Sequence, residues 1–332
     1  MRLYKNLKAS RLPAPVFTLT MFVLLTTLSL YAQPSESSFS AASPRQKNVT
    51  TGRATETGVI DGGGRYSKNR EAENLMNEGE SHFSQGEFEQ ALTAYRKALK
   101  LDPNIYEAAL FSGDAYVATN TYDEAEIWYQ KAIAIDPLRE AAYRRSAMPL
   151  MRQERYNEAR ERYVEAYIVE PYNRFPVADL IEWARITNTG ILHPALEVPE
   201  IKFDEKGYAR SNLSVNPLGE DGSSAWLAYV STRETWRRDK FARTFPKQKN
   251  YRHSLPEEAE ALRGVIKAFK EKKAKNPNPQ ISFLSGLNDD GYLEAFILLA
   301  MPDEGIAQDY AEYLKQNRDR LRQYVLKYVI KK

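Results

Sequence analysis

The side chains of this 332-residue chain that are best suited to proton transfer or metal binding at neutral pH are its three histidines, His82, His193 and His253. They lie far apart in the sequence, and none belongs to a regularly spaced set of the kind that holds zinc. The chain contains no cysteine, which excludes thiolate metal ligands, disulfide bonds and a nucleophilic thiol. From these residues we predict no catalytic site, no metal site and no cofactor.

Among the three histidines, His253 is the strongest candidate for a chemical role. It precedes a predicted helix at 256–275, where a general base could lie. The same segment is explained as a capping loop, because Ser254 followed by Glu257 has the spacing of a capping box. We interpret His253 as part of that loop, and His82 as a side chain packed between two helices.

Two charged segments could bind a ligand, one a metal ion and the other an anionic polymer or lipid headgroup. Asp289-Asp290-Gly291 is similar to a fragment of a calcium loop, but the alternating oxygen ligands and the terminal Glu of that loop are missing, so a helix N-terminus is the better interpretation. Residues 233–252 interleave basic and aromatic side chains, which would suit an anionic polymer or a lipid headgroup. A solvated helix face, or docking against the acidic residues 289–312, explains the same composition.

The elements that would position any site are set by a repeat of 34 residues. Four columns are identical in all three copies: Ala91, Ala125 and Ala159; Tyr95, Tyr129 and Tyr163; Ala98, Ala132 and Ala166; and Pro103, Pro137 and Pro171. Self-similarity at a fixed period of this length is typical of helical solenoids. The small residues allow paired helices to cross closely, the tyrosines fill the volume beside each crossing, and the prolines end each second helix.

These columns resemble the tetratricopeptide repeat family, whose unit is a helix, a turn and an antiparallel second helix. The resemblance covers three repeats at 72–173, about a third of the chain. Gly86 and Asn120 suit the positive φ of a tight interhelical turn, whereas Glu154 in the third copy does not, which predicts a looser third turn.

The resemblance implies a concave groove, lined by the first helix of each hairpin, that binds a peptide or protein partner. By helical spacing the groove-facing residues are Met76, Asn77, Glu80, Phe83, Leu110, Phe111, Asp114, Val117, Arg144, Arg145, Met148, Met151 and Arg152. The predicted groove is acidic at one end and basic at the other, so its partner should carry apolar anchors and the complementary order of charge. The Lys and Asn pattern with which some family members clamp a C-terminal carboxylate is absent at Met76 and Glu80.

The rest of the chain is organised around these repeats. A basic stretch followed by an apolar run over 16–30 predicts a signal peptide at 1–32, and the run of about 15 residues is shorter than the roughly 20 that span a bilayer. The Ser-, Thr- and Gly-rich segment 33–70 predicts a disordered linker. We predict a repeat domain at 71–189 that ends in a capping helix, an extended connector with a β-hairpin at 190–223, and a helical region at 224–332. The predicted fold class is all-α.

These features predict an exported, non-enzymatic protein, periplasmic or secreted, that acts as an envelope scaffold, adaptor or assembly factor. Retention of the N-terminal segment as a membrane anchor is the alternative localisation. Two alternative functions remain: an enzyme whose active site lies in the C-terminal half, and a module that binds anionic surfaces through residues 233–252. The formal net charge of +3 is too small to indicate nucleic-acid binding.

Overall fold

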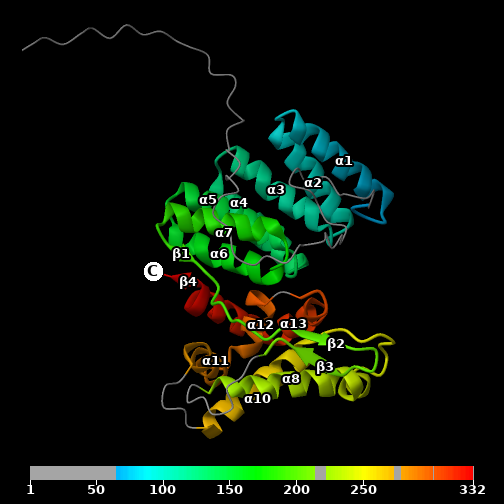
Figure 1. Ribbon diagram of the computed structural model, residues 1–332. Coiled ribbons are helices and arrows are strands. Elements are labelled where there is room, and N and C mark those ends of the chain that lie inside the picture. The colour runs from blue at the N-terminus through cyan, green and yellow to red at the C-terminus, as the bar shows by residue number, and fades with distance from the viewer. Residues whose placement is uncertain (1–64, 214–221, 273–277, 302, 332) are drawn as a thin grey trace, which may run out of the picture. The chain divides into compact units, whose positions relative to one another are not determined.

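The computed structural model describes residues 65–213, 222–272, 278–301 and 303–331. The predicted signal peptide at 1–32 and the predicted linker as far as residue 64 lie outside these residues. The described chain is built almost entirely of helices and carries two short pairs of strands, so the predicted all-α class is confirmed (Figure 1).

The first part of the described chain consists of three antiparallel helical hairpins and one further helix (Figure 1). The hairpins pair α1 (Arg70–Ser84) with α2 (Phe88–Leu101), α3 (Tyr106–Ala118) with α4 (Tyr122–Ile135), and α5 (Glu140–Arg152) with α6 (Tyr156–Val169). Helix α7 (Arg174–Ile186) packs against α6 and α5. Successive hairpins stack through α2 against α3 and α4 against α5, which produces a continuous helical array.

Close crossing inside the first two hairpins depends on glycine. A Cβ atom added to Gly79 would lie 2.3 Å from Tyr95 Cε1, and one added to Gly113 would lie 2.6 Å from Tyr129 Cε1. Real carbon pairs approach to roughly 3.5–4.0 Å, so the tyrosine ring occupies the space of the missing methyl group. Both tyrosines are 1% exposed, and the spacing of small and aromatic residues therefore fixes the contact between paired helices.

The three interhelical turns have the same conformation. Gly86, Asn120 and Glu154 have φ values of 78°, 59° and 58°. In the third turn the N–H of Glu154 donates to the Met151 carbonyl at 3.1 Å, matching the bond from Gly86 to Phe83 at 3.0 Å. The predicted looser third turn is therefore wrong. Packing of α5 on α6 holds Glu154 in a left-handed conformation that glycine adopts without steric cost.

The helices of the C-terminal region form three groups in chain order. The first comprises the short 3-10 helix η1 (Ser223–Ala225), α8 (Trp226–Thr235), the π-helical turn η2 (Trp236–Lys240) and α9 (Phe241–Thr244). The second comprises α10 (Leu255–Lys272), α11 (Pro279–Asp289) and α12 (Leu293–Ala300). The third comprises η3 (Ile306–Asp309), α13 (Tyr310–Tyr324) and the π-helical turn η4 (Val325–Val329). Helix α10 packs against α8, α11 and α12 and is central to the region.

Two antiparallel strand pairs complete the described chain. Strands β2 (Ile201–Phe203) and β3 (Ala209–Ser211) form the short hairpin that the sequence predicts in the connector. Strand β1 (Gly190–Ile191), which follows α7, pairs with β4 (Ile330–Lys331) from the other end of the C-terminal region.

The third hairpin and the C-terminal region share one hydrophobic core. This core contains Tyr163 and Ile168 from α6 together with Leu262 from α10, Phe296 from α12 and Tyr324 from α13. The apolar end of the repeat array is thus covered by α7 and by the C-terminal region together, because an uncovered end would leave that surface in water.

Polar contacts fix the C-terminal region on the third hairpin. The hydroxyl of Tyr310 donates to the Ile168 carbonyl at 2.6 Å, and that of Tyr172 donates to the Leu298 carbonyl at 2.9 Å. Arg318 pairs with Glu165 at 2.9 Å and donates to the Tyr143 hydroxyl at 2.7 Å. These contacts fall on α6, on Tyr172 in the loop that follows it, and on the buried Tyr143 of α5.

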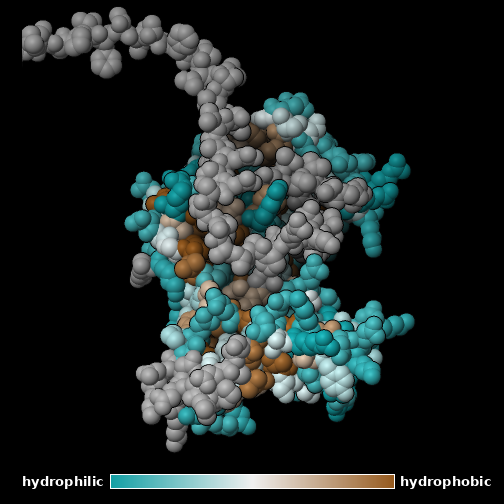
Figure 2. Space-filling view, in the orientation of Figure 1, coloured by the Kyte–Doolittle hydropathy of each residue, from teal (hydrophilic) through white to brown (hydrophobic). Residues whose placement is uncertain are grey.

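The face of the molecule that Figure 2 shows is mainly hydrophilic. On this face, hydrophilic side chains are spread over the repeats and the C-terminal region, with smaller hydrophobic patches between them. Within the described residues, none of the helices combines the length and apolar character that crossing a bilayer requires.

Candidate binding groove

The first helices α1, α3 and α5 provide the face on which the sequence predicts a binding site. Helix α3 lies against α5, and α5 lies against α7. Positions that recur every 34 residues therefore form rows across these helices. One row contains Asn77, Phe111 and Arg145, and the next contains Glu80, Asp114 and Met148.

The predicted groove residues differ in how far they reach solvent. Asn77, Met148 and Arg152 are exposed. Half-buried positions are Glu80, Phe83, Asp114, Arg144, Arg145 and Met151. The buried positions are Met76, Leu110, Phe111 and Val117, with exposures of 0%, 1%, 6% and 9%. Met76 and Leu110 belong to the core of the first two hairpins rather than to the groove surface, because they lie one helical position away from the Asn77 row.

Two of the three arginines expected at the basic end of the groove, Arg144 and Arg145, are paired within the chain. Arg145 on α5 forms an ion pair with Asp114 on α3. Arg144 pairs with Glu140 at 2.9 Å and with Asp179 on α7 at 3.3 Å. Both guanidinium groups are nearly buried, with side-chain exposures of 11% and 13%. These pairs reduce the free positive charge that the sequence predicts at this end, where Arg152 is exposed.

The same pairs fix the relative positions of the first helices. Asp114 also accepts a hydrogen bond from the Tyr129 hydroxyl at 2.8 Å, so a side chain of α4 orients the carboxylate that holds Arg145. In the neighbouring interface Arg139 pairs with Glu107 at 2.7 Å. Partly buried ion pairs with several hydrogen bonds restrict side-chain motion, which makes this part of the groove a preformed surface.

Tyr66 and Ser67, which precede α1, lie on the first-repeat end of the groove. The ring of Tyr66 meets the ring of Phe111 edge to face, with centroids 6.4 Å apart, and its hydroxyl donates to Glu80. The backbone N–H of Ser67 donates to Glu73 Oε2 at 2.9 Å, and its hydroxyl donates to Asp102. The last residues of the predicted linker, 65–69, therefore pack on the repeats. The sequence carried one signal for this packing, an aromatic residue beside the glycine-rich segment.

The carboxylate of Glu80 is held in an environment of low polarity. Burial raises the pKa of Glu80, and the hydrogen bond from Tyr66 opposes that rise. Its Oε1 atom is buried and has no hydrogen-bond partner among the described residues. A buried acceptor left unpaired costs about 1–3 kcal/mol. A hydrogen-bond donor that reached Glu80 Oε1 would therefore be stabilised at this end of the groove.

The comparisons with known proteins bear on the hairpins. A family model described as tetratricopeptide repeat matches residues 76–140. The match runs from within α1 to the first residue of α5, and the helical hairpins are consistent with tetratricopeptide repeats. Among curated proteins, none matches the chain.

Several solved structures of tetratricopeptide repeat domains are similar to part of the chain. The first TPR of Spaghetti bound to an HSP90 peptide is 22% identical, with 38% of this chain and 99% of that chain covered and a TM-score of 0.34. The Sgt2 TPR domain from Aspergillus fumigatus is 22% identical, with 41% and 94% covered and a TM-score of 0.34. The Arabidopsis OM64 TPR domain is 22% identical, with 35% and 96% covered and a TM-score of 0.33.

Beyond the tetratricopeptide repeats, His253 belongs to a buried polar cluster. Its Nε2 lies 2.9 Å from Glu258 Oε2, and Arg233 donates to Glu258 at 3.2 Å and to Glu257 at 2.7 Å. Both carboxylates are 0% exposed. Burial lowers the pKa of His253, but hydrogen bonds with Asp303 and Glu258 outweigh it and raise the pKa to about 9. The ion pairs and hydrogen bonds of this cluster connect α8, α10 and the loop before η3.

The capping box predicted at Ser254 and Glu257 is wrong. The hydroxyl of Ser254 is buried without a partner among the described residues, and Glu257 accepts from Arg233 and from the Tyr251 hydroxyl instead. The N–H of Leu255 donates to Asp309 at 2.8 Å, so a carboxylate distant in sequence caps α10. His82, in contrast, is half-buried as expected, with Nδ1 2.6 Å from Glu87 Oε2.

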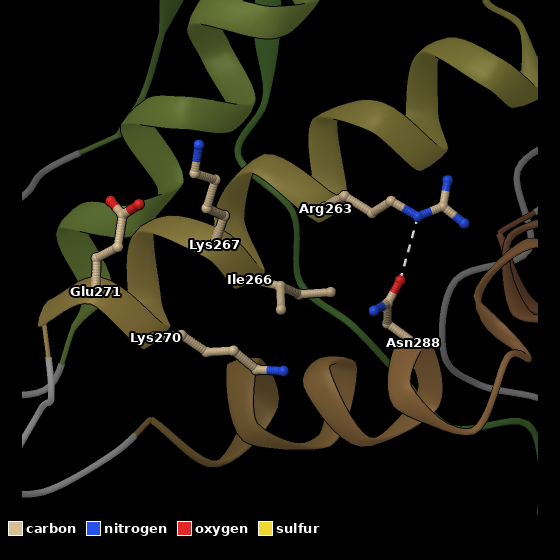
Figure 3. Close-up of a pocket in the computed structure, with 6 residues that line it drawn as sticks. All are labelled: Arg263, Ile266, Lys267, Lys270, Glu271 and Asn288. Atoms are coloured by element: carbon tan, nitrogen blue, oxygen red, sulfur yellow. Dashed lines mark hydrogen bonds between the residues drawn. The ribbon is translucent and has the colours of Figure 1, made fainter.

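A shallow hollow of about 590 Å³ lies between α10 and α11 and is lined by Arg263, Ile266, Lys267, Lys270, Glu271 and Asn288 (Figure 3). Arg263 reaches toward Asn288 and also pairs with Glu294, while Lys270 pairs with Asp289 at 3.0 Å. The lining charges are thus largely matched by acidic neighbours. Across the described residues, no group of three or more His, Asp and Glu side chains is arranged to hold a metal.

The basic segment 233–252 is also paired within the chain. Arg252 pairs with Asp309, Lys240 pairs with Glu260 at 2.5 Å, and the guanidinium of Arg237 lies 4.1 Å from the centroid of the Tyr251 ring. This pairing reduces the free positive charge that an anionic surface would attract.

Proposed function

We propose that the chain binds an extended segment of a protein partner in the groove formed by α1, α3 and α5. The observation that carries this proposal is the position of the C-terminal region, which packs on α6 and its adjoining loops rather than on the groove face. The exposed Asn77 and Met148 and the half-buried Glu80 remain on that face, whereas Met151 packs against the core shared with the C-terminal region. Methionine suits adaptable apolar contacts, and aligned polar groups give a bound segment its direction.

The internal ion pairs support the same proposal. Because Arg145–Asp114 links α5 to α3 and Arg144–Asp179 links α5 to α7, a partner meets a surface that loses little freedom on binding. Pre-organisation of this kind lowers the entropic cost of association. We therefore assign Arg144 and Arg145 a positioning role, and we expect apolar anchors rather than charge order to select the partner.

Site-specific photo-crosslinking in the native cell tests this function. A photoreactive amino acid replaces Asn77 or Met148 in the groove, and the matched control replaces Gln90, which is exposed on α2. We expect the two groove positions to form the same adduct with one partner, whereas position 90 forms none. Equal adducts at all three positions, or none at the groove positions, would contradict the proposal.

We further propose that the protein is exported and serves as an envelope scaffold, adaptor or assembly factor without enzymatic activity. The basic and apolar pattern of residues 1–32 supports export, and the mutual pairing of the buried groups around His253 supports a structural role for them. N-terminal sequencing of the protein recovered from the cell envelope is expected to begin near Gln33. A start at Met1 would favour the retained anchor.

A further inference from the structure

The first-repeat end of the groove contains a seat for one aromatic side chain. Phe111 forms its floor and packs against Tyr95, with ring centroids 6.0 Å apart. Tyr66 stands on this floor at an interplanar angle of 84°, which places the edge of one ring against the face of the other. Such edge-to-face pairs are favoured over stacked ones because of the ring quadrupole.

The polar rim of this seat selects a hydroxyl donor. Burial raises the pKa of Tyr66, and the hydrogen bond to Glu80 together with the charges of Glu80 and Glu107 raises it further. Glu73 and Asp102 hold the adjacent Ser67. Glu107 is paired with Arg139, so Glu80 is the acceptor that favours a neutral phenol over a phosphorylated one.

Tyr66 reaches this seat by a route that a separate chain could also take. Ser67 is 6% exposed, and the residue that caps α1, Asn69, has an extended backbone with φ −76° and ψ 113°. The segment therefore crosses from the start of α1 to the side chains of α3, and the backbone N–H of Ser67 donates to Glu73 on α1. An extended partner can offer the same donor.

We propose that the space between α1 and α3 is a tyrosine-accepting pocket, that Tyr66 is its tethered occupant, and that the partner presents an unphosphorylated tyrosine which displaces Tyr66. This inference rests on the proposed function of the groove. The unpaired Oε1 of Glu80 gives the partner an acceptor that Tyr66 leaves unused. A segment that brings its tyrosine together with one further donor can therefore outcompete the tethered residue.

Peptide selection on the full chain tests the pocket. A random peptide library is selected on the wild-type protein and on Tyr66→Ala, and the enriched peptides are measured by fluorescence anisotropy. We expect the Tyr66→Ala protein to enrich peptides with a tyrosine at a shared position. A tethered occupant acts at an effective concentration in the millimolar range, so wild-type protein should bind these peptides about ten-fold more weakly.

Variants of the peptide and of the rim test the chemistry. Replacing the shared tyrosine by phenylalanine removes a hydrogen bond to a carboxylate and should weaken binding about ten-fold, and phosphotyrosine should abolish it. Glu80→Gln should lose most of the preference for tyrosine over phenylalanine. Gln90→Ala, an exposed change on α2, should match wild type, and Tyr66→Phe keeps the ring in place if Tyr66→Ala unfolds.

The possible results distinguish failure of the tyrosine pocket from failure of partner binding in the groove. Enriched peptides that lack tyrosine but compete at the groove would overturn the tyrosine pocket and leave the groove function standing. Equal affinity of wild type and Tyr66→Ala would overturn the role of Tyr66 as occupant. Failure of both proteins to enrich any peptide, with no groove crosslink in the cell, would overturn both proposals.

Discussion

Gly113→Ala measures how closely the paired helices cross. The added methyl group would lie 2.6, 2.7 and 2.9 Å from three carbons of the Tyr129 ring. Relief requires a movement of about 1 Å to restore ordinary van der Waals separation. The ring cannot swing freely, because Tyr129 is 1% exposed and its hydroxyl is bonded to Asp114 at 2.8 Å.

The expected magnitude combines two opposing effects. Overpacking of a core costs about 1–3 kcal/mol, and the clash here involves a rigid ring, which favours the upper part of that range. Replacing glycine by alanine inside a helix gains about 1 kcal/mol. We expect Gly113→Ala to lower the free energy of unfolding by about 1–2 kcal/mol. Urea denaturation followed by circular dichroism provides the measurement.

Gly286→Ala is the matched control for this change. Gly286 also lies inside a helix, α11, but a Cβ atom there would meet nothing within 4 Å. We expect this variant to be more stable than wild type by about 0.5–1 kcal/mol. If Gly113→Ala proved as stabilising as Gly286→Ala, the argument that glycine permits the close crossing would be refuted.

Three further changes test the turns and the buried charges by urea denaturation. Glu154→Gly relieves a left-handed residue and should raise the free energy of unfolding by roughly 0.5–1 kcal/mol. Arg233→Leu leaves buried carboxylates without their cation and should cost roughly 3–5 kcal/mol, whereas Arg185→Leu at an exposed pair should change stability by less than about 0.5 kcal/mol. The pKa of His253 is about 9 when folded, above its ordinary value of 6.5. Protonated His253 therefore stabilises the fold fully below pH 6.5, and this contribution is lost as pH rises through 9; His253→Gln should lack that decline.

Each of these expectations can fail in a recognisable way. An unchanged or lower stability of Glu154→Gly would mean that the turn is not strained. Equal losses for Arg233→Leu and Arg185→Leu would show that burial does not distinguish the two ion pairs. A His253→Gln variant that keeps the full decline between pH 6.5 and 9 would assign the titration to another group.

The repeats were predictable because each column that recurs in the three copies has one packing role. Glycine or alanine opposite tyrosine, and proline at the end of each second helix, specify hairpins without reference to distant residues. The groove was only partly predictable, because helical spacing identifies a helix face but not which side chains beside it are buried. Helical spacing places Asn77 and Met148 on one face correctly, but a rotation of one position separates the buried Met76 and Leu110 from that face.

The errors fall where tertiary contacts override local signals. Glu154 adopts a left-handed conformation because the helices on both sides are packed, which no local propensity reveals. The cap of α10 comes from Asp309, more than fifty residues further on, and β1 pairs with β4 across most of the C-terminal region. Arg144 and Arg145 have partners on neighbouring helices, so a count of charges along α5 could not show that they are neutralised.

The shared core of the third hairpin and the C-terminal region limits how this protein can diversify. A solenoid can be extended by stacking a further unit on an open end, but the surface onto which a fourth hairpin would stack here is covered by residues such as Leu262 and Phe296. A duplication placed after α6 would have to recreate that complementary surface on the new unit. Growth or loss of hairpins is therefore expected on the α1 side or within the array, and related chains should vary in repeat number there while this junction stays constant.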